Sequence, residues 1–265
     1  MINIFPRSIL LKIGYSKLGS TMVKILKKNS ARTFFETENG IKMYLDMVNP
    51  QTWDLMLRKD PEKKIKELFL NNVELGNTVI DVGANIGEFS LIASKKVGEK
   101  GKVFSLEPLE NNVLWVQKNL SLNNFKNCYV MKCAAGNKLE TKILYKKNEN
   151  ATMGILDPSI EKENLVISSE IKVETIDNII NGKKIEKVDM LKIDVEGFEY
   201  EVLIGCKESM RQKKIKKIIC EIHTEYLKTR GIDEQIIYSL LKNNGFIIES
   251  VGKDEKNPHI LAYLS

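Results

Sequence analysis

Short runs of β-branched and aliphatic residues alternate along this chain with longer segments in which apolar residues recur at helical spacing. The longer segments predict helices at residues 60–74, from 87 onward and at 111–122, the first with Asp60 as N-cap and Pro61 in its first turn. The apolar runs predict strands at residues 78–82, 102–106, 127–133, 188–193, 217–223, 246–251 and 260–264. This alternation predicts an α/β fold, in which helices cover a doubly wound, mostly parallel sheet and the last two strands form an antiparallel hairpin.

Two regions lie outside this alternation. Residues 136–175 contain two short strand-like runs, 141–145 and 165–173, separated by a turn-rich stretch. We expect this region to be an insertion that shapes the substrate side of the molecule. Residues 1–59 precede the alternating series and are expected to form an N-terminal extension that is helical in part. The remainder, residues 60–265, is expected to form one catalytic domain.

The turn after the first predicted strand carries the clearest chemical signal. The strand ends at Asp81, and Gly83 and Gly87 flank a tight turn before a helix, which brings backbone N–H groups close to a ligand. The second strand ends at Glu107, about twenty residues further on, where a carboxylate can bind the two hydroxyls of a ribose. Together these features predict a nucleoside cofactor.

The spacing of the turn narrows the choice of cofactor. Dinucleotide enzymes favour Gly-x-Gly-x-x-Gly, whereas here the glycines are separated by three residues, of which the first two are Ala84 and Asn85. This looser pattern is typical of methyltransferases that use S-adenosyl-L-methionine (SAM), which has no phosphate to bind. An NAD-type oxidoreductase is the less favoured alternative.

Polar residues also follow the fourth and fifth predicted strands. Asp194 and Glu196 come after the fourth, and Glu221 and His223 after the fifth. Ligands of doubly wound sheets bind outside the carboxyl ends of the strands, where the strand order reverses. In the order that class I methyltransferases have, this point lies between the first and fourth strands, so all four residues should converge there with Asp81 and Glu107.

These four residues are candidates for catalysis. His223 could act as general base on an acceptor hydroxyl, with Asp194 or Glu196 as alternatives, or its ring could serve only to hydrogen-bond a neighbouring loop. The three carboxylates and the imidazole could also hold magnesium or manganese. The cationic cofactor already compensates part of their charge, so a divalent metal is possible but not required.

Composition sets looser bounds. The 41 Lys and Arg residues exceed the 35 Asp and Glu residues, a net charge of +6 that permits an acidic partner without demanding one. The basic run at 211–217 is interpreted as a solvated helix end, and no nucleic-acid partner is expected. Four cysteines lack Cys-x-x-Cys spacing, which favours a reduced, cytoplasmic location.

The N-terminal segment requires separate treatment, since residues 1–28 interleave apolar and basic positions. No segment of the chain approaches the length of a transmembrane helix. We expect residues 1–28 to form a helix packed on the domain or on a second subunit of a homo-oligomer. Peripheral contact with a membrane is the alternative.

Four motifs, in order, resemble the FkbM family of SAM-dependent methyltransferases over roughly residues 60–250: Asp-Val-Gly-Ala-Asn-Ile-Gly, Leu-Glu-Pro, Leu-Lys-Ile-Asp-Val-Glu-Gly-Phe-Glu and Glu-Ile-His. The resemblance implies a seven-stranded Rossmann-like fold and O-methylation of a hydroxyl on a sugar, glycolipid or related small molecule. A noncatalytic SAM-binding or membrane-associated module is the alternative. The resemblance also implies cofactor contacts, which fall on Asp81, Gly83, Ala84, Asn85, Gly87, Glu107, Ala134 and Asp194.

Overall fold

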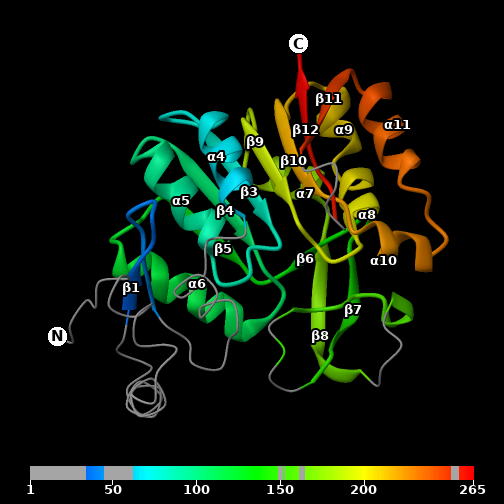
Figure 1. Ribbon diagram of the computed structural model, residues 1–265, viewed down its shortest axis with the longest axis horizontal. Coiled ribbons are helices and arrows are strands. Elements are labelled where there is room, and N and C mark those ends of the chain that lie inside the picture. Colours follow the sequence, from blue (N-terminus) through cyan, green and yellow to red (C-terminus); the bar gives the residue numbers. More distant parts are fainter. Residues whose placement is uncertain (1–33, 45–61, 149–150, 152, 161–164, 252–256) are drawn as a thin grey trace.

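The central sheet has the predicted architecture. The computed structural model describes residues 34–44, 62–148, 151, 153–160, 165–251 and 257–265. Seven strands lie in the order β11-β12-β10-β9-β3-β4-β5 (Figure 1). Their bounds are β3 Thr78–Val82, β4 Lys102–Leu106, β5 Cys128–Met131, β9 Met190–Ile193, β10 Lys217–Glu221, β11 Phe246–Val251 and β12 His259–Leu264.

The strand directions place the switch point where it was predicted. Strands β5, β4, β3, β9 and β10 run parallel, and β12 lies antiparallel between β10 and β11. The chain moves outward from β3 in one direction through β4 and β5, and then returns to pair β9 with the other side of β3. The carboxyl ends of β3 and β9 therefore flank the point at which the strand order reverses.

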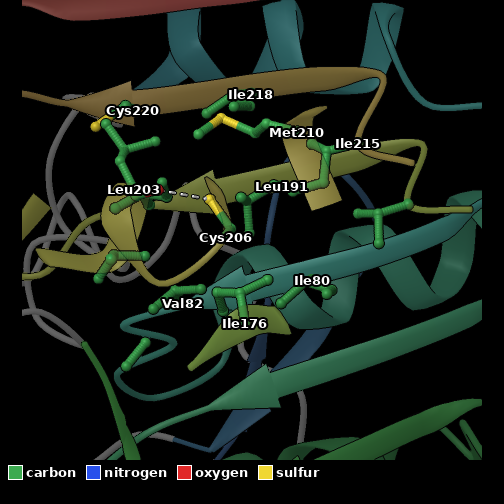
Figure 2. Close-up of a cluster of buried hydrophobic side chains, with 14 of the residues drawn as sticks. Ile80, Val82, Ile176, Leu191, Leu203, Cys206, Met210, Ile215, Ile218 and Cys220 are labelled. Atoms are coloured by element: carbon green, nitrogen blue, oxygen red, sulfur yellow. Dashed lines mark hydrogen bonds between the residues drawn. The ribbon is translucent and has the colours of Figure 1, made fainter. Parts of the chain in front are cut away.

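Helices cover both faces of this sheet. One face packs against α4 (Lys63–Asn71), α5 (Glu88–Val97) and α6 (Glu110–Leu122), and the other against α7 (Ile176–Gly182), α8 (Glu199–Ile204), α9 (Lys207–Arg211) and α11 (Gln235–Asn243). Neighbouring residues of one strand enter opposite cores: Val79 packs with α5 and Ile80 with α7. Figure 2 shows the core on the face of the sheet that α7, α8 and α9 cover, where their side chains meet those of β3, β9 and β10.

The insertion forms a small sheet of its own. Strands β6 (Ala134–Ala135), β8 (Val166–Glu174) and β7 (Glu140–Lys146) lie in that order, with β7 and β8 antiparallel and β6 parallel to β8. Both predicted strands of the insertion are present: β7 is one residue longer at each end than predicted, and β8 has the predicted length but begins one residue later. A 3₁₀ helix, η2 (Pro158–Ile160), contacts α10 (Thr224–Thr229). This sheet stands apart from the central one, below α8 and α10 in Figure 1.

The described part of the N-terminal extension is a hairpin that the sequence did not predict. Strands β1 (Phe34–Glu36) and β2 (Lys42–Tyr44) pair antiparallel, and Ile41 and Met43 are fully buried in the core beside α6. The predicted helix at residues 1–28 lies outside the described residues. No helix in the described part of the chain is both long and apolar enough to cross a bilayer.

The predicted start of the first helix was wrong. Helix α4 begins at Lys63, with Glu62 at the N-cap position and no side-chain cap hydrogen bond, and it ends at Asn71. Asp60 and Pro61, on which the prediction rested, lie outside the described residues. The Asp-Pro pair is a good helix start in isolation, and the helix observed begins two residues after Pro61.

Candidate active site

A cavity of about 390 Å³ opens at the carboxyl ends of β3, β4, β9 and β10. Its walls come from the glycine turn after β3, the ends of the other three strands, the insertion and α10. Eight of its lining residues are polar or charged side chains that matter for the chemistry: Glu62, Asn85, Glu107, Asp194, Glu196, Glu221, His223 and Tyr226. The size of the cavity suits a small-molecule ligand.

The glycine turn packs directly against the loop that follows β9. Gly83 has a φ of 78°, and a Cβ atom there would lie 1.8 Å from the carbonyl oxygen of Asp194. Gly87 has a φ of 94° and precedes α5 as its N-cap residue. Between them Asn85 also has a positive φ, 51°. Only glycine can bring the β3 turn and the β9 loop this close, and their contact forms the floor of the cavity.

Asp81 lies beneath the glycine turn and does not line the cavity. Its side chain is completely buried; Oδ2 accepts a 2.6 Å hydrogen bond from the Ser90 hydroxyl, and Oδ1 lies 3.5 Å from Lys192 Nζ. Lys192 Nζ also lies 3.3 Å from Asp194 Oδ2 and sits 4.8 Å from the centroid of the Phe89 ring. This arrangement indicates that Asp81 supports the turn from below through Ser90 and Lys192.

Glu107 occupies the wall formed by β4. Oε2 accepts a hydrogen bond from the Asn85 backbone N–H at 2.8 Å, and Oε1 accepts from the Leu109 N–H at 2.9 Å and from Asn112 Nδ2 at 3.2 Å. Burial raises the pKa of this carboxyl group to about 7, against the lowering effect of these three donors. A carboxylate has about four acceptor positions, so capacity remains for a ligand hydroxyl.

An apolar wall continues from Glu107. Leu106, Pro108, Cys133, Ala134 and Ala135 line this part of the cavity, and Met153, Gly154 and Leu156 of the insertion lie on it as well. The insertion is fastened to α10 by Arg230, whose Nε donates to Asp157 Oδ2 at 2.9 Å. This part of the cavity is mainly apolar and lies beside the Glu107 carboxylate.

The four candidate catalytic residues do meet at the other end of the cavity. His223 Nε2 lies 3.5 Å from Glu196 Oε2 and 3.7 Å from Glu221 Oε1. Asp194, Glu196 and His223 each place one possible ligand atom within 4.8 Å of the others. The fold therefore brings Asp194, Glu196, Glu221 and His223 together, as their positions after the ends of β9 and β10 predicted.

His223 is held on its far side by a residue that the sequence did not single out. Its Nδ1 lies 2.8 Å from Oε1 of Glu199, the first residue of α8, and that carboxylate is completely buried. Burial disfavours the charged ring, but the Glu199 hydrogen bond and charge, with Glu196 and Asp194, outweigh it and raise the pKa of His223 to about 9. Without a ligand the ring is therefore protonated at neutral pH.

The two carboxylates beside His223 respond in opposite ways. Burial raises the pKa of Glu196 to about 7, opposed by His223 and reinforced by Asp194 and Glu221. Burial also acts to raise the pKa of Glu221, but its hydrogen bonding and charge interactions with His259 and the charge of His223 lower it to about 2. The pKa of Glu196 is therefore near neutral pH, whereas that of Glu221 is well below it.

Two triads in the cavity have the donor set of a cation site. One is Asp194, Glu196 and His223, and the other is Glu62, Asp194 and Glu221. Oxygen donors with one imidazole fit magnesium or manganese. Positive groups are already in contact with these carboxylates, because Lys192 lies beside Asp194 and His223 beside Glu196 and Glu221. The cluster therefore does not require a metal for charge compensation.

Fold and site together define the class: a methyltransferase with a Rossmann-like sheet that uses SAM. The chain belongs to the FkbM methyltransferase family, because the Methyltransferase FkbM domain matches residues 81–248. This membership confirms the resemblance drawn from the four motifs and sets aside the NAD-type alternative.

Individual relatives are distant. The chain is 26% identical over 216 residues to methyltransferase sdnD of Sordaria araneosa, covering 69% of this chain and 81% of that protein. It is 26% identical over 183 residues to hexuronic acid methyltransferase AglP of Haloferax volcanii, covering 68% and 67%. The crystal structure of methyltransferase FkbM from Methylobacillus flagellatus KT matches with a TM-score of 0.50 and 20% identity, over 72% of this chain and 44% of that one. This chain spans less than half of that protein, and the likeness concerns the fold.

Proposed function

We propose that the protein transfers the methyl group of SAM to a hydroxyl of an uncharged sugar, glycolipid headgroup or related polyol. The observation that carries this proposal is that one cavity has two ends, which β3 and β9 separate in the sheet. Glu107 and apolar residues after β4 line one end, and His223 among carboxylates after β10 lines the other. The first end fits an adenosine and the second fits the acceptor.

The cofactor would be held by residues of three elements. SAM supplies an electrophilic methyl group on a positively charged sulfur. Glu107 would accept hydrogen bonds from the ribose hydroxyls, Ala134 and its neighbours would pack beside the adenine, and Gly83 and Asn85 would lie along the methionine portion. Asp194, which shares the floor of the cavity with Gly83, would face the positive charge.

His223 would remove the proton from the acceptor. A neutral alcohol is a weak nucleophile, so a base is needed as the oxygen–methyl bond forms. His223 Nε2 takes the hydroxyl proton, and the acceptor oxygen ends as a methyl ether. The ring must first be neutral, and a cationic ligand nearby favours that state, since like charges disfavour the protonated ring. Glu196, whose proton exchanges near neutral pH, is the second candidate for the base.

The charges of the walls bear on the kind of acceptor. The described residues that line the cavity include Glu62, Glu107, Asp194, Glu196, Glu221 and Glu225 but neither lysine nor arginine. An acceptor with a carboxylate or phosphate would add negative charge to a set whose neighbouring cations, Lys192 and His223, already contact Asp194, Glu196 and Glu221. Carboxylates are instead good acceptors for the hydroxyl groups of a neutral sugar. This argument separates the present chain from its relative AglP, which is named for hexuronic acid.

The acceptor prediction can be tested with a matched panel of glycosides. Purified protein would be incubated with methyl-labelled SAM and neutral hexosides, hexuronic acid glycosides or sugar phosphates, and methylated product and S-adenosylhomocysteine (SAH) would be quantified. We expect transfer to the neutral glycosides. A preference for the hexuronic acid or for a nitrogen acceptor would contradict the proposal. The Gly83→Ala variant discussed below serves as the inactive control.

A second prediction concerns Glu107 and pH. Glu107→Gln should weaken SAH binding by about tenfold or more, because a hydrogen bond to a charged group is replaced by one to a neutral amide. The pKa of Glu107 is raised to about 7, so wild-type affinity should fall as the pH is lowered through 7 and the carboxylate is protonated. The affinity of the variant should lack this dependence. Calorimetric titration with SAH on both sides of pH 7 measures both effects.

The matched control for this prediction is Glu110→Gln. Glu110 lies on the same stretch of chain, at the start of α6, but is exposed and paired with Lys132. Its substitution should leave SAH affinity unchanged. Wild-type affinity that is flat across this pH range, with normal binding by Glu107→Gln, would remove Glu107 from the cofactor site.

A further inference from the structure

Glu199 lies behind His223, on the side away from the cavity. It is the first residue of α8, its side chain is completely buried, and it is not among the residues that line the cavity. Its Oε1 lies 2.8 Å from His223 Nδ1 and also accepts the backbone N–H of Gly197 at 2.8 Å. A carboxylate can only accept, so the hydrogen on this side of the ring is carried by Nδ1.

The ring is therefore fixed on three sides. Nδ1 is bound to Glu199, one face stacks on Tyr226 with an interplanar angle of 6° and a centroid separation of 5.8 Å, and Nε2 points to the cavity between Glu196 and Glu221. His223 itself follows β10 and precedes α10, so its backbone is held between two regular elements. Only Nε2 is available to a ligand.

We infer that Glu199 is a positioning residue for methyl transfer: it holds His223 with the proton on Nδ1 and directs Nε2 to the acceptor hydroxyl. This inference rests on the proposed function, in which His223 is the base. When Nε2 takes the acceptor proton, the ring becomes cationic, and the buried carboxylate 2.8 Å away stabilises that charge. Neither effect requires Glu199 to touch the substrate.

Glu199 also holds the loop that carries Glu196. Glu196 and Gly197 have φ values of 52° and 89°, and a Cβ atom on Gly197 would lie 2.6 Å from Tyr226 Cβ. The hydrogen bond from the Gly197 N–H to Glu199 stabilises this turn with two positive φ values, which packs against Tyr226 beside the His223 ring. The Glu199 carboxylate thus fixes both His223 and the loop that carries Glu196, which lies 3.5 Å from Nε2 of the ring.

A purely structural role, in which Glu199 only stabilises this loop, predicts a different outcome on substitution. Glu199→Gln keeps a side-chain oxygen that can accept from both Gly197 and His223 while removing the negative charge. A structural role would then leave catalysis intact. Glu199→Asp keeps the charge on a shorter side chain and should restore part of the activity. Glu208→Gln, on the exposed surface of α9, is the matched control. In the part of the chain that the structure describes, the Glu208 side chain accepts hydrogen bonds from its neighbours Arg211 and Gln212.

The experiment combines three measurements on the 265-residue chain in the presence of EDTA. SAH binding is measured by calorimetry. Methyl transfer to the best neutral glycoside gives kcat and KM. Two-dimensional ¹⁵N spectra of the imidazoles, recorded on both sides of pH 9, report the protonation of the His223 ring and the tautomer of its neutral form. The chain has only two histidines, His223 and His259, so a His223→Gln sample assigns the signals.

We expect Glu199→Gln to bind SAH normally, to keep the wild-type KM and to lose about 10²-fold in kcat, with a changed His223 spectrum. Wild-type kcat in this variant would overturn the inference. If the wild type binds SAH but transfers no methyl group to any glycoside, the proposal of a glycoside acceptor is wrong, and the ¹⁵N spectra alone test the positioning role of Glu199. A His223 spectrum that is the same in wild type and Glu199→Gln would then overturn the positioning role.

Discussion

Replacing Gly83 by alanine should abolish measurable binding of SAH, whereas the same replacement at Gly76 should not. A Cβ atom at Gly83 would lie 1.8 Å from the carbonyl oxygen of Asp194, far inside van der Waals contact, and the residue has a φ of 78°. The β3 turn and the β9 loop must therefore separate. Because both loops form the floor of the cavity, the separation displaces Asn85 and Asp194 together, and we expect a cost of about 1–3 kcal/mol in stability as well.

Gly76 provides the matched control, because it has a similar φ, 82°, and no atom lies within 4 Å of its added Cβ. Both variants carry the same backbone strain, but only Gly83→Ala has the collision. Calorimetry with SAH and thermal unfolding of both proteins separate loss of the site from loss of the fold. A folded Gly83→Ala protein that binds SAH with wild-type affinity would show that this turn does not form the cofactor site.

The central sheet could be predicted because its strands are buried on both faces. Strand β9 is buried at all four positions and β3 at four of five. Three residues of each strand are apolar, and a carboxylate lies near its end, Asp81 within β3 and Asp194 directly after β9. The hairpin of β1 and β2 gave no such signal. Its strands have three residues each, and β2 is held by Asn119 of α6 and by Asn123, directly after that helix, 75 and 81 residues away. Contacts at that separation leave no periodic pattern in the sequence.

The site was predictable to the same extent. Residues at strand ends converge because the topology forces them to, which located Asp194, Glu196, Glu221 and His223. Depth below the surface has no comparable signal. The sequence predicts Asp81 as a cofactor contact from its place before the glycine turn, and it could not show that the carboxylate lies under the turn, hydrogen-bonded to Ser90 of α5.

Partners supplied by other elements were missed for the same reason. Lys192 lies in the otherwise apolar strand β9, two residues before Asp194. Its charged side chain can be buried there because Asp81 and Asp194 lie beside Nζ, and the sequence does not show these contacts. Glu199 stands within the Asp-Val-Glu-Gly-Phe-Glu motif, which was the one sequence signal that could have pointed to it. Glu62 reaches the cavity from the start of α4, more than 130 residues before Asp194 in the chain.

His223→Gln should lower kcat by about 10²- to 10⁴-fold while leaving SAH affinity unchanged, because it removes the proposed base but not the adenosine end of the cavity. The direction of the pH dependence follows from the raised pKa of the ring, about 9. A base must be deprotonated, so kcat/KM for SAM should rise as the pH increases through neutrality and level off only near 9. The rise of kcat with pH should occur at lower pH than the rise of kcat/KM, since the positive charge of bound SAM disfavours the protonated ring.

Glu196→Gln distinguishes the two candidate bases in the same experiment. The pKa of Glu196 is raised to about 7. If the Glu196 carboxylate is the base, the rate of methyl transfer should rise with pH and level off near 7, and this rise should be absent from the variant. If His223 is the base, Glu196→Gln removes a negative charge 3.5 Å from Nε2 and should shift the rise to lower pH without abolishing it. A pH profile that levels off near 7 and disappears in Glu196→Gln would therefore transfer the role of base from His223 to Glu196.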